Sequence, residues 1–96
     1  MTTSDKANEL LRELIRQRIP VMEANGNALT IMGKDGSTIR LGCYCHHKRS
    51  GCTIVEAFCF DSSGARKNTT YNHSWGGTVK PMTVVRWVLK QLEKLS

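Results

Sequence analysis

Residues 38–60 read TIRLGCYCHHKRSGCTIVEAFCF. Apolar and polar side chains alternate on both sides of the central loop, with the two-residue period of a β-strand. In the first segment one face is shared by Ile39, Leu41, Cys43 and Cys45. Arg40 and Tyr44 fall on the other face. The Gly- and Ser-containing loop reverses the chain, so the stretch predicts an antiparallel hairpin of strands at 38–45 and 52–60.

Shorter strands flank this hairpin. Residues 28–32 (ALTIM) fit a strand, and the loop that follows contains Asp35-Gly36, a dipeptide typical of tight hairpin turns. After the turn at 61–64, residues 65–71 fit a fourth, polar strand at an edge of the sheet. Strands joined by short loops pair with their neighbours, so we expect an antiparallel meander.

Helical periodicity appears at both ends of the chain. Residues 4–19 contain one apolar stripe: Ala7, Leu10, Leu11, Leu14 and Ile15. Thr3 or Ser4 can cap this helix, and Pro20 ends it. Residues 81–95 form the second helix, and its side chains expected to face the core are Met82, Val85, Val88, Leu89, Leu92 and Leu95.

These patterns predict a single compact α+β domain over 1–96, with 1–3 and 96 frayed. The predicted order is α-β-β-β-(β)-α: a three- to four-stranded antiparallel meander sheet, with an N-terminal and a C-terminal helix on one face. This order partly resembles that of double-stranded-RNA-binding domains. The Gly-Pro-x-His-like loop and Lys-Lys-x-Ala-Lys-like helix start of that family are not found, so no residue roles follow from it.

The strand at 52–60 can be oriented in two ways. Val55, Ala57 and Cys59 lie on one face, and the other face holds Ile54, Glu56, Phe58 and Phe60. Because phenylalanine buries more apolar area than alanine or cysteine, we expect the Phe face in the core. In the alternative, both phenylalanines join Arg40 and Tyr44 on an open sheet face that could stack bases or accept a partner.

Positive charge gathers in the last third of the chain. The 96 residues hold 14 Lys and Arg against 8 Asp and Glu, a formal net charge of +6. Residues 62–96 contain six of the cations and one acid, Glu93. A field of one sign attracts nucleic acid or an acidic protein face. No secretory leader or membrane-length apolar run is visible, so we expect a cytoplasmic protein with reduced cysteines and no membrane partner.

Two basic clusters are the main candidate anion contacts. One is the hairpin loop, with His46, His47, Lys48 and Arg49. The other is a column at every fourth position of the last helix, with Arg86, Lys90 and Lys94, a spacing of like charges that weakens an isolated helix. Further candidates are the cations Arg40, Arg66 and Lys67 and the aromatic anchors Tyr44 and Trp75. Trp75 lies in a Gly-bounded loop, where it either closes the core as a lid or serves as an exposed anchor.

Thiols and imidazoles also cluster in the hairpin. Zinc could be ligated by Cys43, Cys45, His46, His47 and Cys52, although the Cys-x-Cys spacing differs from the usual Cys-x₂₋₄-Cys knuckle. A Cys45–Cys52 disulfide and Cys–His catalysis are the other readings of this cluster. No orienting carboxylate, nucleophile elbow or phosphate loop accompanies it, so we expect no enzyme and no cofactor.

Three functions follow as hypotheses. The first is a non-enzymatic basic module that contacts nucleic acid through a Lys/Arg face. The second is a regulatory inhibitor of the kind that phages and mobile elements encode, such as an anti-CRISPR protein, which docks on a nucleic-acid-handling protein. The third is a small zinc-stabilised interaction module. The oligomeric state is not specified by any pattern in the chain.

Overall fold

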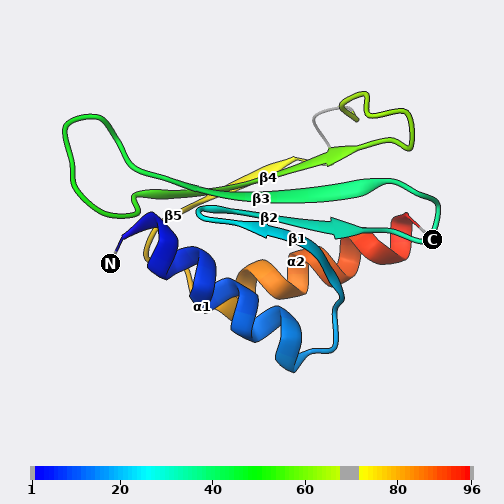
Figure 1. The fold of residues 1–96 in the computed structure, drawn as a ribbon, viewed down its shortest axis with the longest axis horizontal. Coiled ribbons are helices and arrows are strands. Elements are labelled where there is room, and N and C mark those ends of the chain that lie inside the picture. The colour runs from blue at the N-terminus through cyan, green and yellow to red at the C-terminus, as the bar shows by residue number, and fades with distance from the viewer. Residues whose placement is uncertain (1, 68–71, 96) are drawn as a thin grey trace.

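The computed structural model describes residues 2–67 and 72–95. Its elements follow the order α1 (Thr3–Arg16), β1 (Val21–Asn25), β2 (Ala28–Met32), β3 (Thr38–Tyr44), β4 (Ile54–Phe60), β5 (His73–Gly76) and α2 (Pro81–Lys94). Both helices lie on the same side of the sheet (Figure 1). The predicted α+β class, with an N-terminal and a C-terminal helix against an antiparallel meander, is therefore confirmed.

The sheet has five strands in the order β1-β2-β3-β4-β5, all antiparallel, where three or four were predicted. β1 was missed because Val21–Asn25 mixes apolar and polar residues and its pairing with β2 shifts register between Val21 and Glu23. β5 lies in a segment that was predicted to be a loop. Of the predicted strand at 65–71, Arg66 makes an isolated bridge to Phe60, and 68–71 lie outside the described residues.

The helices begin and end at identifiable signals. Thr2 caps α1, because its side chain accepts the Asp5 N–H while the Asp5 carboxylate accepts the Thr2 N–H. α1 ends at Arg16, before the predicted position 19, since Arg18 adopts a positive φ of 59° and turns the chain away. α2 begins with Pro81, whose missing N–H costs nothing in the first turn. No helix in the described part of the chain is long and apolar enough to cross a membrane.

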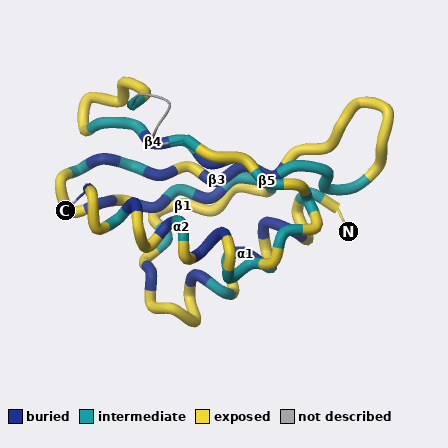
Figure 2. Tube along the Cα trace, turned by 180° about the vertical axis from the view of Figure 1, so that it is seen from behind, coloured by how far each residue is buried: buried dark blue, intermediate teal, exposed yellow. Residues whose placement is uncertain are grey.

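The core lies between the sheet and the two helices (Figure 2). Val55, Ala57 and Cys59 are fully buried, so the small face of β4 meets the helices and the expectation that Phe58 and Phe60 enter the core is wrong. Small strand residues let the helices approach closely and fill the space with their own side chains: Leu10, Leu14, Val84, Val85 and Val88. Packing between layers, and not the area of single side chains, decided the orientation of β4.

One predicted core position of α2 is also wrong. Leu89 is 39% exposed, whereas Val84, which was not predicted, is fully buried. The buried stripe of α2 is Val84, Val85, Val88 and Gln91. The stripe is thus rotated about the helix axis from the predicted one, and Leu89 falls on its border.

Candidate nucleic-acid interface

The face of the sheet opposite the helices is the main candidate site. Strand register assigns its side chains, because residues paired across strands point to the same face. Thr30 pairs with Arg40 and Arg40 with Phe58, while Tyr44 pairs with Ile54. We call this the open face, and its members on β2, β3 and β4 are Ala28, Thr30, Met32, Thr38, Arg40, Gly42, Tyr44, Ile54, Glu56, Phe58 and Phe60. Figure 1 shows both helices on the opposite side.

Phe58 holds a cation against its ring. The Arg66 guanidinium carbon lies 4.1 Å from the Phe58 ring centroid, within cation–π range. Arg66 is brought there by the turn after β4, in which Asp61 accepts the N–H groups of Ser63 and Ala65. Hydrogen bonds to Asp61, that of the Ser63 hydroxyl first and that of the Ala65 N–H second, lower the pKa of this carboxyl from its usual value.

Tyr44 is the second aromatic group of the open face and is 42% exposed. Its ring lies across Gly42, two residues earlier on β3, where an added Cβ would overlap the ring. Gly42 therefore makes room for a tyrosine that lies along the sheet. A ring held in this way offers a flat apolar surface to an incoming ring.

The β3–β4 loop extends the open face at the Tyr44 end. A shallow cavity of about 570 Å³ there is lined by Tyr44, Cys45, His46, Arg49, Thr53, Ile54 and Glu56. The loop is fixed by hydrogen bonds from the His46 N–H to Thr53 Oγ1 and from the Thr53 N–H to the Tyr44 carbonyl. The rings of His46 and His47 are stacked with centroids 4.3 Å apart, and Lys48 is exposed.

Within the part of the chain that the structure describes, the cations of the open face form no ion pair. In the described ranges, the ion pairs with measured distances join Lys6 to Glu9 and Arg16 to Glu13, both within α1. Arg40, Arg49 and Arg66 are all exposed. Acids also lie near them: Glu56 lines the Tyr44 cavity and a second one beside Phe58, Glu23 pairs with Thr30 in the row that continues to Arg40, and Asp61 lies in the turn before Arg66. The exposed guanidinium groups on this surface can still pair with an anionic partner.

The basic column of α2 lies on the other side of the sheet. Arg86 and Lys90 line a groove with Thr83, Trp75 and Trp87. Trp75 pairs with Val55 across the sheet, so it points toward the helices and packs edge-on against Trp87, with ring centroids 5.7 Å apart. Trp75 is half-buried on β5. One part of its ring packs against the core and another lines the groove. Lys94 is exposed in the last turn of α2, and Lys67 is half-buried beside Arg66.

The predicted cations are thus divided between two surfaces. Arg40, Arg66 and the basic loop belong to the open face, and the column of α2 belongs to the helix side. The Lys/Arg face of the first hypothesis therefore comprises two separate surfaces, one on each side of the sheet. Sequence reasoning also gave no role to His73 and Trp87, and it placed Phe58 in the core.

The thiols do not gather around a metal position. Within residues 2–67 and 72–95, no group of three or more His, Cys, Asp or Glu side chains could hold a metal ion, and all four cysteines are free. Cys43 and Cys59 are buried, whereas Cys45 is exposed. Burial raises the pKa of Cys43 to about 12 and that of Cys59 to about 11, so both thiols stay protonated at neutral pH.

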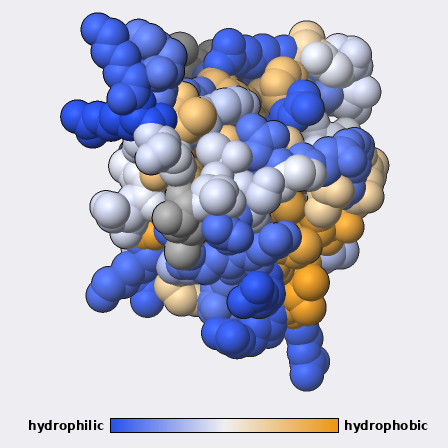
Figure 3. All heavy atoms as spheres, turned by 60° about the vertical axis from the view of Figure 1, so that its left-hand side comes forward, coloured by the Kyte–Doolittle hydropathy of each residue, from blue (hydrophilic) through white to orange (hydrophobic). Residues whose placement is uncertain are grey.

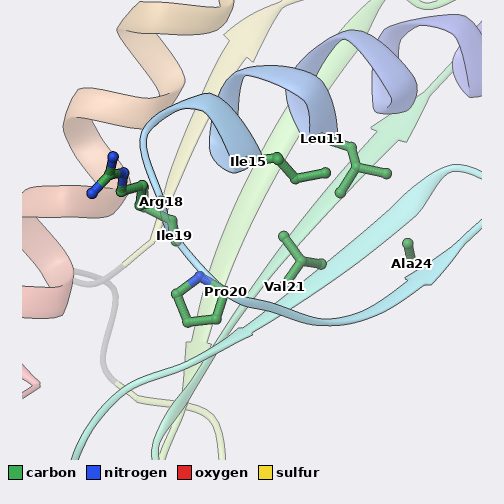
Figure 4. Close-up of a pocket in the computed structure, with 7 residues that line it drawn as sticks. All are labelled: Leu11, Ile15, Arg18, Ile19, Pro20, Val21 and Ala24. Carbon is green, nitrogen blue, oxygen red and sulfur yellow. The ribbon is translucent and has the colours of Figure 1, made fainter.

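An apolar groove runs between α1 and β1 (Figure 4). The groove has a volume of about 410 Å³ and is lined by Leu11, Ile15, Arg18, Ile19, Pro20, Val21 and Ala24. Ile15 is 61% exposed, and Met22 on the neighbouring strand is 53% exposed. Figure 3 shows a largely hydrophilic surface on which hydrophobic side chains are concentrated in one region of the view.

Comparisons of the chain with protein-family models, with curated proteins and with solved structures gave no match.

Proposed function

We propose that this protein binds single-stranded nucleic acid on the open face of its sheet. The observation that carries the proposal is the grouping of Tyr44 and the Arg66–Phe58 pair with Arg40 on a sheet face opposite both helices. Aromatic rings supply stacking for bases, and guanidinium groups supply contacts for phosphates and a second stacking plane.

Each side chain has a distinct role in this proposal. One base stacks on the Tyr44 ring, and a second stacks on the Arg66 guanidinium that covers Phe58. Arg40 lies directly across from Phe58 on β3, four residues before Tyr44, where it contacts a phosphate beside the second base. Arg49 and His46, beside Tyr44, meet the strand beyond the first base.

A single strand suits this face better than a duplex. Bases in a duplex are already stacked on one another and present only their edges in the grooves, so their faces are closed to Tyr44 and Phe58. Single strands can splay their bases outward onto aromatic side chains. The sheet also has five strands, unlike the helix or two-stranded ribbon that enters a major groove.

The test is a titration of fluorescently labelled oligonucleotides followed by anisotropy. A single-stranded mixed-sequence oligomer of about twelve nucleotides, within the usual range of such sites, is compared with its duplex form. We expect tighter binding of the single strand, and an affinity that falls as salt rises. Arg40→Gln should weaken binding, whereas Arg12→Gln, which removes an exposed charge of the same sign from α1, should not. Equal affinity for single strand and duplex, or equal effects of the two variants, would contradict the proposal.

The second candidate is an inhibitor that docks on a nucleic-acid-handling protein. The observation that favours it is the α1–β1 groove, which includes the exposed Ile15 and is an apolar surface that nucleic acid would not need. A pull-down from host lysate with and without nuclease separates the two. Capture of one protein that survives nuclease and is lost in Ile15→Glu supports the inhibitor, and capture lost on nuclease treatment rejects it.

A further inference from the structure

A chain of rings and cavities connects the open face to the groove of α2. A shallow cavity beside Phe58 is lined by Glu56, Phe58, Asn72, His73 and Ser74. His73 pairs with the buried Ala57, so its side chain points to the helix side, and the cavity that it helps to line lies at the β5 edge beside Phe58. β5 is the last strand of the sheet, so no described strand lies beyond it.

The same histidine contacts the rings of the groove. The His73 and Trp75 ring centroids are 4.6 Å apart, and those of His73 and Trp87 are 6.3 Å apart with nearly parallel planes. Trp75 and Trp87 in turn form the wall of the groove that holds Arg86 and Lys90. His73 thus lies at the β5 edge, between the cavity beside Phe58 and the tryptophan rings on the helix side.

We infer that a bound strand does not stop at the open face but turns around the β5 edge at His73 and enters the groove between β5 and α2. The inference rests on the proposed function and extends it by a second subsite. In this subsite a base stacks against the Trp75 and Trp87 rings, and Arg86 and Lys90 contact its flanking phosphates. The ligand is therefore a single strand long and flexible enough to turn a corner.

This second subsite explains why the α2 column carries like charges at an unfavourable spacing. Arg86 and Lys90 are exposed like charges one helical turn apart, an arrangement that costs helix stability. Phosphates placed between them would remove that repulsion. The subsite also accounts for two half-buried indoles beside exposed cations, since rings with a free edge at the surface can accept a stacked base.

The two tryptophans report on this groove alone. Trp75 and Trp87 are the only tryptophans in the 96 residues, and both line the groove and not the open face. Intrinsic tryptophan emission therefore separates the two subsites without a label on the protein. An oligomer of about four nucleotides covers the open face, whereas one of about twelve can also reach the groove.

The experiment titrates the full chain with both lengths and follows tryptophan emission and oligomer anisotropy together. We expect both lengths to bind, and only the longer one to quench tryptophan. In Arg86→Gln/Lys90→Gln the longer oligomer should lose about twentyfold in affinity at ~0.1 M salt, the value for two lost phosphate contacts, and the shorter one should lose little. The control is Arg12→Gln/Arg18→Gln, which removes the same charge from two exposed residues, one in α1 and one just after it. Circular dichroism checks that each variant keeps its fold.

The outcomes separate the two proposals. Binding of both lengths without a length-dependent quench, or with equal losses in the α2 variant and the α1 control, overturns the second subsite and leaves the open face intact. Binding of neither length overturns both. Quenching by the longer oligomer that disappears in the α2 variant, with binding of the shorter one unchanged, supports the path around β5.

Discussion

The guanidinium of Arg66 lies 4.1 Å above the ring of Phe58 on the face of the sheet that the helices leave open. Arg66 follows β4 by a tight turn and bridges back to Phe60, so the pair comes from one short segment of chain. Such a pair is usually worth about 0.5–1 kcal/mol when exposed. It holds a cation and a flat stacking plane at one point of the surface.

Removal of the open-face arginines should change the salt dependence of binding. If Arg40 and Arg66 each contact one phosphate, the double variant Arg40→Gln/Arg66→Gln should reduce the slope of log K against log salt by about 1.4 for a single strand. Anisotropy titrations at several salt concentrations measure this slope. An unchanged slope would mean that neither arginine meets a phosphate.

Tyr44 should contribute stacking that does not depend on its hydroxyl. Tyr44→Ala should weaken single-strand binding by about 1–3 kcal/mol, whereas Tyr44→Phe should bind nearly as well as the parent chain. Because Tyr44 is 42% exposed, its loss should have little effect on folding. The opposite pattern, with Tyr44→Phe as weak as Tyr44→Ala, would assign the contribution to a hydrogen bond instead.

The orientation of β4 predicts unequal effects on stability. Leu41 is 1% exposed on the helix face, so Leu41→Ala should lower the free energy of unfolding by about 2–5 kcal/mol. Phe58→Ala on the open face should cost clearly less, although phenylalanine is the larger residue. Urea denaturation followed by circular dichroism compares them. A larger loss for Phe58→Ala would mean that the Phe face of β4 is the buried one.

Buried thiols should make the fold sensitive to alkali. The pKa values of Cys43 and Cys59 rise from their ordinary value of 9.0 to about 12 and about 11, so unfolding releases protons above pH 9. Stability from these thiols is present below pH 9 and is lost as pH rises toward the folded pKa values. Urea midpoints from pH 7 to 11 in reducing buffer should fall, and fall less in Cys43→Ala/Cys59→Ala.

The same burial can be checked by thiol labelling. In the native protein at pH 8 a thiol reagent should react with exposed Cys45 and more slowly with half-buried Cys52. Cys43 and Cys59 should react only after denaturation. Rapid labelling of all four cysteines in the folded chain would contradict the packing of β3 and β4.

The fold could be predicted from local patterns where the patterns were strong. The β3–β4 hairpin, the turn at Asp35-Gly36 and both helices follow from periodicity and turn chemistry within a few residues. The edge strands β1 and β5 could not, because an edge strand is short, polar and defined by its one neighbour. Val21–Asn25 and His73–Gly76 become strands only through their pairing with β2 and β4.

The candidate site was harder to predict than the fold. The cations could be identified in the sequence. Their division between two faces could not, because it depends on which face of the sheet α2 packs against. Phe58 and the small residues around it fit either face of β4, and the choice was made by how closely α1 and α2 pack on Val55, Ala57 and Cys59. The His73–Trp75–Trp87 cluster joins residues from β5 and α2 that no local pattern connects.

The most direct test of the open-face account is an NMR titration that follows the ring protons of tyrosine and phenylalanine as a single-stranded oligonucleotide is added. The chain has two of each residue, so the signals are few and can be assigned by substitution. We predict an upfield shift of the Tyr44 ring, since a stacked base shields it, a smaller shift of the Phe58 ring, which Arg66 separates from its base, and no change at Leu11 or Ile15 methyl groups in the α1–β1 groove. Unmoved Tyr44 and Phe58 rings with shifted methyl groups in that groove would contradict it.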